Sequence, residues 1–222
     1  IASLGLEALT VGVHTKGLQA LLEVCGLTGR RIESDDVSFR LAPRINAAGR
    51  MSSAEVAAEL LLSAGASSVE ACSELAERLD ELNNRRREQE RQVTKAACET
   101  IDAGPVEAEQ PCHVVWSEAW HRGVIGIVAS RLAERFRRPA IVISVEGEQA
   151  YGSGRSIPGF DLLGALDHSK DLLTQYGGHR QAVGLRLNSA RLQEFRRHFE
   201  CYVDKKLLLE DCVPRLQVDA EL

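Results

Sequence analysis

The sequence lacks the features of a membrane-spanning or disulfide-stabilised protein. Its 222 residues include no run of about eighteen apolar residues, so no segment is expected to cross a membrane. The six cysteines are widely spaced and form no Cys-x-x-Cys pair, which argues against a zinc site and a disulfide framework. The amino terminus carries no basic region and no methionine, so a secretory signal is not expected, and a chain that starts in mid-pattern suggests a piece of something longer. These absences predict a protein of the reducing cytoplasm.

The sequence also lacks an overall positive charge. It has 27 Lys and Arg against 32 Asp and Glu, a net charge of −5, which argues against a protein that coats nucleic acid indiscriminately. The distribution is uneven, however. Residues 1–112 carry 12 basic and 18 acidic side chains (net −6), whereas residues 113–199 carry 12 basic and 8 acidic side chains (net +4). Since the local sign of charge draws a polyanion to a surface, residues 113–199 are the candidate nucleic-acid-binding region.

Two glycine-rich segments lie in this basic region, GSGRSIPGF at 152–160 and YGGHRQAVG at 176–184. Glycine lets the backbone approach a ligand closely, and an arginine guanidinium matches two phosphate oxygens at once. Apolar runs at 140–145 and 182–187 indicate strands that would hold both segments as rigid loops. Ordinary tight turns are the alternative, but two such segments with anion-binding groups favour a phosphate site.

The first half of the chain predicts helices. Residues 1–30 are helix-compatible, with Gly26 as a carboxyl-terminal cap, and Ser52 or Ser53 caps a short helix that ends near Ser63. Between them, residues 39–50 carry arginines around small residues, which indicates a turn where the backbone could approach a ligand. A helix of about 35 residues then begins at Ser67 or Ser68 and ends before Gly104 and Pro105. Its polar middle is typical of a strut between two domains.

The period of the apolar pattern changes after residue 105. Strands are expected at 113–116, 139–145 and 182–187, and helices at 124–136, 161–168 and from 189 to about 202. Strands alternating with helices over short connections predict an α/β domain. Residues 213–222 resemble the opening strand of a further domain.

Two histidines stand in polar, glycine-flanked settings, His121 and His179. Either could bind phosphate or assist a metal-bound water. A lone histidine is more often structural, but the neighbouring Gly177 and Gly178 favour a functional role for His179. At the start of the 124–136 helix, the GVIG segment could bind an anion through free N–H groups, or could serve close packing of helix on sheet. Both alternatives stay open here.

Four motifs occur in order: RINAAGR at 44–50, WHRGVIGIVASR at 120–131, and the glycine-rich segments at 152–160 and 177–184. Together they resemble the RecJ-type single-strand-specific exonucleases of the DHH phosphoesterase superfamily. The resemblance runs from about residue 40 to residue 187. It extends to 218–222, which is similar to the strand that leads into the family's OB-fold.

The resemblance implies an α/β fold class in which a long linker helix precedes a DHH-associated α/β domain with a mixed central sheet. Residues 1–35 would be the carboxyl-terminal remnant of a DHH domain, and 36–104 a connecting region with the linker helix. Residues 105–204 would be the DHH-associated domain, and 205–222 the start of an OB-fold.

The resemblance also implies a metal-dependent hydrolase that removes nucleotides from the 5′ end of single-stranded DNA in repair and recombination. Manganese or magnesium would act in the whole protein, with none bound by this chain. Single-stranded DNA would be the partner, no membrane would be involved, and regions outside the chain could contact a single-stranded-DNA-binding protein. The implied substrate-binding residues are Arg44, Asn46, Arg50, His121, Ser153, Gly154, Arg155, Ser156, Gly177, Gly178 and His179, the last also a candidate catalytic residue.

Two residues depart from the family pattern. Leu9 stands where the family's last metal-binding motif has an aspartate, and leucine cannot ligate a hard cation. Val183 stands where the family generally has alanine. The chain alone is therefore expected to be inactive, and a catalytically inactive RecJ-like binding or replication-accessory module is an open alternative. An oligoribonuclease or nucleotide phosphatase of the same superfamily is a third, although those proteins typically lack the RINAAGR element.

Overall fold

A computed structural model describes residues 1–12, 15–63, 68–103 and 110–213. The chain divides into two compact units, residues 1–88 and 89–222, and each is described by itself. The boundary falls within helix α6 (Val69–Asp102), whose 34 residues confirm the predicted long helix. The helix begins as predicted, because the backbone N–H of Ala71 donates to Ser68 Oγ at 3.1 Å and so caps the first turn.

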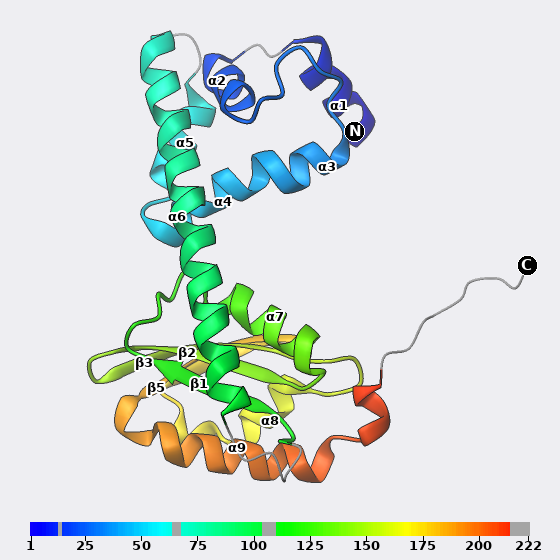
Figure 1. Ribbon diagram of the computed structural model, residues 1–222, viewed down its shortest axis with the longest axis vertical. Coiled ribbons are helices and arrows are strands. Elements are labelled where there is room, and N and C mark those ends of the chain that lie inside the picture. Colours follow the sequence, from blue (N-terminus) through cyan, green and yellow to red (C-terminus); the bar gives the residue numbers. More distant parts are fainter. Residues whose placement is uncertain (13–14, 64–67, 104–109, 214–222) are drawn as a thin grey trace, which may run out of the picture. The chain divides into compact units, whose positions relative to one another are not determined.

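The first unit is helical (Figure 1). Gly26 ends the second helix with φ +64°, as its sequence position predicted. A Cβ on Gly17 would lie 1.8 Å from the carbonyl oxygen of Leu60, so glycine lets two helices pack backbone to backbone there. The elements that precede α6 are α1 (Ala2–Val11), α2 (Lys16–Val24), α3 (Ser34–Asp36), a π-helical turn (Val37–Leu41), α4 (Ala42–Met51) and α5 (Glu55–Leu62).

The turn predicted within residues 39–50 is wrong, because this stretch is continuous helix. Pro43 lies at the start of α4, directly after the π-helical turn Val37–Leu41, and the helix continues through it. Ala47 and Ala48 are fully buried, which shows that the small residues serve packing within the unit. These residues therefore form no turn at which the backbone could approach a ligand.

The second unit is built on a five-stranded mixed sheet in the order β1-β2-β3-β5-β4. Strands β1 and β2 are parallel and joined by α7, whereas the remaining neighbours are antiparallel. This arrangement confirms the predicted α/β class with a mixed sheet. The strands are β1 (His113–Ser117), β2 (Ala140–Glu146), β3 (Gln149–Arg155), β4 (Gln175–His179) and β5 (Ala182–Asn188), and the helices α7 (Ile125–Phe136), α8 (Leu162–His168) and α9 (Leu192–Lys206), with short 3₁₀ turns at Lys170–Leu172, Ser189–Arg191 and Leu209–Cys212.

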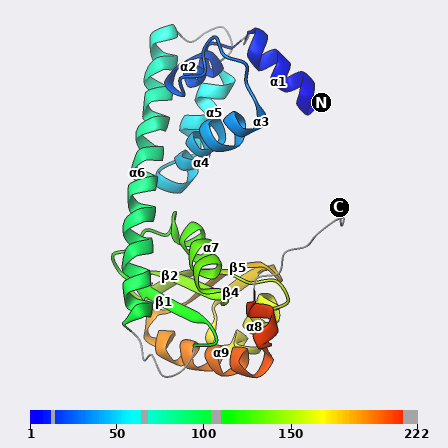
Figure 2. The same ribbon diagram turned by 45° about the vertical axis from the view of Figure 1, so that its right-hand side comes forward.

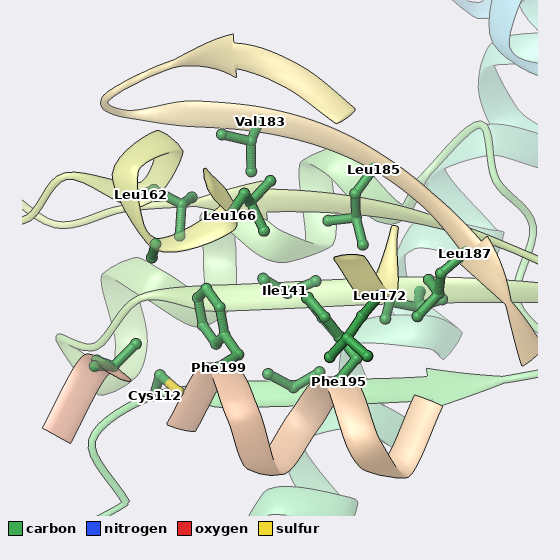
Figure 3. Close-up of a cluster of buried hydrophobic side chains, with 14 of the residues drawn as sticks. Cys112, Ile141, Leu162, Leu166, Leu172, Val183, Leu185, Leu187, Phe195 and Phe199 are labelled. Atoms are coloured by element: carbon green, nitrogen blue, oxygen red, sulfur yellow. The ribbon is translucent and has the colours of Figure 1, made fainter. Parts of the chain in front are cut away.

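The sheet lies between two helical layers (Figures 1 and 2). Helix α7 packs on one face, against β2 and β3, and α8 and α9 cover the other. Figure 3 shows Phe195 and Phe199 of α9 pointing toward Ile141 and the β5 leucines, where they form a closed apolar core. We refer to this side as the core face and to the other as the α7 face.

The loops predicted for the two glycine-rich segments are wrong for residues 152–155, 176–179 and 182–184, which lie in strands, whereas residues 156–160 lie outside the strands. Gly152 and Gly154 lie within β3, while Gly177 and Gly178 lie within β4, which forms a hairpin with β5. Glycine is more frequent in turns than in strands, so the sequence predicts loops for both segments. Glycine is nevertheless needed within β3 because the paired strand lies close: a Cβ on Gly152 would lie 2.8 Å from the side chain of Leu185 on β5.

Among the described residues, none of the helices combines the length and apolar character needed to cross a membrane. The proposed OB-fold strand at 214–222 lies outside the described residues, as do Ser67, Gly104 and Pro105. The domain boundaries expected from the resemblance stay predictions.

Candidate functional site

The pairing register groups the candidate residues into rows that run across β3, β5 and β4 on the α7 face. Gly126 of α7 identifies this face, since a Cβ added to it would lie against Ser153 and Arg155. The first row is Arg155, Ala182 and His179; the second is Ser153, Gly184 and Gly177; the third is Tyr151, Arg186 and Gln175. The fold therefore brings four predicted residues onto one surface: Ser153, Arg155, Gly177 and His179.

Gly154 and Gly178 belong to the opposite, core face, where they pair with Val183. A Cβ on Gly154 would lie 2.8 Å from Val183 Cγ2 and 3.0 Å from Leu162 Cδ2. Gly178 has φ +138°, and its Cβ would lie 2.3 Å from the carbonyl oxygen of Ala182. Packing thus explains both glycines. Val183 is buried against Gly154 on this face.

Arg155 is half-buried and held along its own strand. Its Nη1 donates to Ser153 Oγ at 3.2 Å and to the carbonyl oxygen of Gly154 at 2.8 Å. A Cβ on Gly126 would lie 3.1 Å from Ser153 Oγ and 3.4 Å from Arg155 Nη2. Gly126 therefore makes room for this pair, which favours the packing alternative for this glycine. The result is a hydroxyl and a guanidinium side by side on the α7 face.

Residues 156–181 brace the end of this row. Asp161 accepts from the backbone N–H of Gly164 at 3.0 Å and lies 3.6 Å from Arg180 Nε, so it caps α8 and pairs with the hairpin tip. The N–H of Ser156 donates to Gln181 O at 2.9 Å, and Ser156 Oγ donates to Phe160 O at 2.9 Å. Ser156, predicted to bind substrate, thus ties the end of β3 to the hairpin.

A hollow of about 250 Å³ lies beside the first row. Arg155, Ser156 and Gln181 line one side of it, and Ser130 and Arg137 of the α7 segment line another. Arg137 ends α7 in the left-handed region, with φ 52°. This hollow is large enough for a phosphate, and its charged lining consists of Arg137, Arg155 and one acidic residue, Glu134.

The two candidate histidines lie at opposite ends of the α7 face. His179 is exposed in the first row, and its Nδ1 accepts from the N–H of Gln181 at 3.4 Å. His121 precedes α7, where its Nδ1 accepts from the N–H of Gly123 at 3.0 Å. Its neighbour Arg122 lies over the ring of Tyr151 in the third row. Since the third and first rows are four residues apart on β3, they are separated by roughly 13 Å.

Tyr151, Arg122 and Arg186 were not among the predicted residues. The guanidinium carbons of Arg122 and Arg186 lie 5.4 Å and 5.1 Å from the centre of the Tyr151 ring. A groove of about 400 Å³ lies at this row, lined by Tyr151, Gln175, Gly177, Gly184 and Arg186 among others. The alternation of small and polar residues at 149–155 was the signal that could have revealed a strand and hence this cluster.

The remaining predicted residues lie in the first unit, on α4. Arg44 is paired within the first unit. Its Nε and Nη2 each lie 2.8 Å from Asp80 Oδ1, and Nη1 donates to Arg40 O at 2.8 Å. This pairing ties α4 to α6 and gives Arg44 a structural role. Asn46 and Arg50 are exposed and one helical turn apart, so they share a face of α4.

The described residues contain no group of three or more His, Cys, Asp or Glu side chains placed to hold a metal ion. Leu9, which the resemblance aligns with an aspartate, lies half-buried in α1. The part of the chain that the structure describes thus does not fit a divalent metal centre of its own.

Residues 109–205 match the DHHA1 domain family. The chain is 38% identical over 221 residues to the single-stranded-DNA-specific exonuclease RecJ of Bacillus subtilis. The matched region covers 99% of this chain and 27% of that protein. It is 37% identical over 186 residues to RecJ of Thermus thermophilus, covering 84% of this chain and 26% of that protein. The chain therefore spans about a quarter of the length of these relatives.

Solved structures give the same result. RecJ from Thermus thermophilus in complex with Mg²⁺ superposes with a TM-score of 0.76 at 32% identity, covering 90% of this chain and 30% of that one. An exonuclease RecJ bound to manganese superposes with a TM-score of 0.73 at 34% identity, covering 89% of this chain and 49% of that one. The helical region followed by a mixed sheet is thus the arrangement found in these proteins.

Proposed function

This chain contains a DHHA1 domain and is similar along most of its length to RecJ exonucleases, and from that premise we propose that it supplies the DNA grip of a 5′-to-3′ single-stranded-DNA exonuclease of repair and recombination. The whole protein would act in the cytoplasm on single-stranded DNA. A contact with a single-stranded-DNA-binding protein, through regions outside this chain, stays a prediction.

One observation carries the proposal: Ser153 and Arg155 share the α7 face with His179, beside a hollow that fits a phosphate. The Ser153 hydroxyl and the Arg155 guanidinium can both donate to the oxygens of a 5′ phosphate. His179, exposed in the same row, would lie next to the terminal nucleotide. The net charge of +4 over residues 113–199 supports attraction of a polyanion to this unit.

Hydrolysis in the whole protein would use manganese or magnesium, which activates water and stabilises the leaving oxygen. Carboxylates outside the described residues would have to hold the metal, because these residues contain no suitable group. This chain would hold the 5′ end in place. We therefore expect the 222-residue chain alone to release no nucleotides from DNA, and metal-dependent release by a contaminant-free preparation would contradict this.

Leu9 favours a second function, a RecJ-like binding module without catalysis. Both functions use the same α7 face, so both predict binding of single-stranded DNA by this chain. They differ in the complete protein, which would release nucleotides from the 5′ end only in the first case. The oligoribonuclease alternative has no observation of its own in this structure.

The test of the proposed grip is Arg155→Ala in the 222-residue chain, with binding measured by fluorescence anisotropy. The wild-type chain should bind a short oligothymidylate weakly, and each phosphate contact should add about 0.7 to the salt slope for a single strand. Arg155→Ala should cost about 1–3 kcal/mol of binding, the range for hydrogen bonds to charged groups, and Arg155→Lys should recover only part of it. The loss should be greater for DNA with a 5′ phosphate than for DNA with a 5′ hydroxyl.

Arg197→Ala is the matched control, since Arg197 is exposed on α9 at the other side of the sheet. It removes the same charge but should leave the preference for the 5′ phosphate unchanged. If Arg155→Ala instead lowers the melting temperature and weakens binding of both DNA ends equally, Arg155 braces the strand and the proposed grip is wrong.

A further inference from the structure

A cluster of two arginines on one tyrosine lies at the third row of the α7 face, away from Arg155. Arg122 comes from the turn before α7, Tyr151 from β3 and Arg186 from β5. Arg186 Nε also donates to Gln149 Oε1 at 2.9 Å, which fixes its guanidinium against the ring. Guanidinium groups held on an aromatic ring are preorganised, so less conformational entropy is lost when they bind an anion.

The cluster borders the groove of about 400 Å³. Tyr151 and Arg186 line it, as does Gln175, which is paired with Arg186 on the neighbouring strand β4. None of the described residues that line the groove is acidic. An open groove with an aromatic ring and guanidinium groups suits a ligand that carries both a negative charge and a flat or apolar part.

The floor of the groove contains a second feature that the described protein does not explain by itself. Gly177 and Gly184 face each other across β4 and β5, and both are exposed. Neither has a positive φ, and a Cβ built on either would meet no heavy atom within 4 Å. Gly178, next in sequence to Gly177, would instead clash with backbone. Neither conformation nor packing therefore requires Gly177 and Gly184, whereas a ligand lying on the strand backbone would.

We propose that this groove is a second nucleotide subsite, in which Arg122 and Arg186 bind an internucleotide phosphate of single-stranded DNA while the attached nucleotide lies on the backbone of Gly177 and Gly184. This proposal rests on the proposed function, because it extends the grip at Arg155 along the same strands. The third row is roughly 13 Å from the first along β3, so the two subsites hold different nucleotides of one strand. The groove subsite thus binds independently of the chemistry at the 5′ end.

Two substitutions in the 222-residue chain test the subsite. Arg186→Gln removes one charge from the cluster; it should weaken oligothymidylate binding about fivefold and lower the salt slope by about 0.7. Gly184→Val fills the floor of the groove with a residue that favours strands, so binding should fall about tenfold while the melting temperature stays level or rises. Both losses should be equal for DNA with a 5′ phosphate and DNA with a 5′ hydroxyl.

Arg197→Gln on α9 is the control for charge and should bind within about twofold of the wild-type chain, since one distant charge contributes little to a local contact. If Arg155→Ala weakens binding but Arg186→Gln and Gly184→Val bind like wild type, the groove subsite is overturned and the grip at Arg155 stands. If Gly184→Val lowers the melting temperature in step with binding, glycine there serves the fold and the subsite is also overturned. Failure of the wild-type chain to bind single-stranded DNA at low salt would overturn both proposals.

Discussion

The two faces of strands β3, β5 and β4 use glycine for different reasons. On the core face, neighbouring atoms lie close to Gly152, Gly154 and Gly178. A Cβ added to any of the three would clash with an atom of β5. On the α7 face, a Cβ added to Gly177 or Gly184 would meet no heavy atom of the described residues within 4 Å. Glycines that are adjacent in sequence, such as Gly177 and Gly178, thus differ: packing requires glycine on the core face, and the α7 face leaves open space at its glycines. The contrast teaches that a glycine-rich motif has to be divided by face before its function is inferred.

Gly178→Ala should have the largest effect on stability. The new Cβ would meet the carbonyl oxygen of Ala182 at 2.3 Å and the Cα of Val183 at 2.8 Å, and neither backbone atom can move without disturbing the hairpin. With the added strain of φ +138°, we expect a loss of about 3 kcal/mol in the free energy of unfolding, measured by urea denaturation.

Gly177→Ala is the matched control at the adjacent position. Its Cβ meets nothing, and alanine restricts the unfolded chain more than glycine does, so stability should rise by about 0.5 kcal/mol. Equal destabilisation by the two substitutions would remove the distinction between the faces.

The α7 face is itself divided into a covered part and an open part, and His113 tests the covered part. His113 is 6% exposed at the start of β1, with its ring 4.8 Å from that of Phe136 on α7. Burial, followed by the charges of Arg138 and Arg196, lowers the pKa of His113 to about 4.

The consequence is a loss of stability in acid. The unfolded chain protonates His113 near its ordinary pKa of 6.5, but the folded unit does so only near 4, so the unfolded state binds more protons between these values. The contribution of the neutral His113 ring to the free energy of unfolding is therefore complete above pH 6.5, and it is lost as the pH falls toward 4. Between about pH 8 and pH 5 the free energy of unfolding should fall by about 2 kcal/mol more in the wild type than in His113→Gln. Identical pH profiles in urea denaturation would show that His113 is open to water.

The smallest effect is expected in the first unit, where Arg44 is held and Arg50 is exposed. Removing the Arg44 guanidinium takes away the 2.8 Å ion pair of Asp80, but Asp80 keeps the hydrogen bond that Asn84 Nδ2 donates to it at 3.1 Å. The setting is partly exposed, since the Arg44 and Asp80 side chains are 16% and 30% exposed. Arg44→Met should therefore cost about 1 kcal/mol of stability, and Arg50→Met less than about 0.5 kcal/mol. A double-mutant cycle with Asp80→Asn measures the coupling, and a value near zero would return Arg44 to the candidate DNA contacts.

Much of the fold followed from patterns that are local in the chain. The 3.6-residue period and the Ser68 cap predicted α6, and apolar runs predicted β1, β2 and β5, because each element buries its own stretch of residues. The strands β3 and β4 were missed, as was the helix through 39–50. In each case small residues indicate turns locally, and in β3 glycine is required by residues distant in sequence, since Gly152 and Gly154 lie against Leu185 and Val183 of β5.

The sequence by itself determined the chemical groups and their order: a basic region, paired glycine-rich segments, and Ser153, Arg155 and His179 as candidates for binding an anion. Tertiary structure decided which of these groups share a surface. Cross-strand register set Arg155 and His179 in one row and turned Gly154 and Gly178 to the core face, although Gly178 itself is exposed. The folded chain also joined Arg122, Tyr151 and Arg186, which no local pattern connects. The physical reason is that side chains alternate between the faces of a strand, so function depends on which residues pair across strands, and only the folded sheet fixes that pairing.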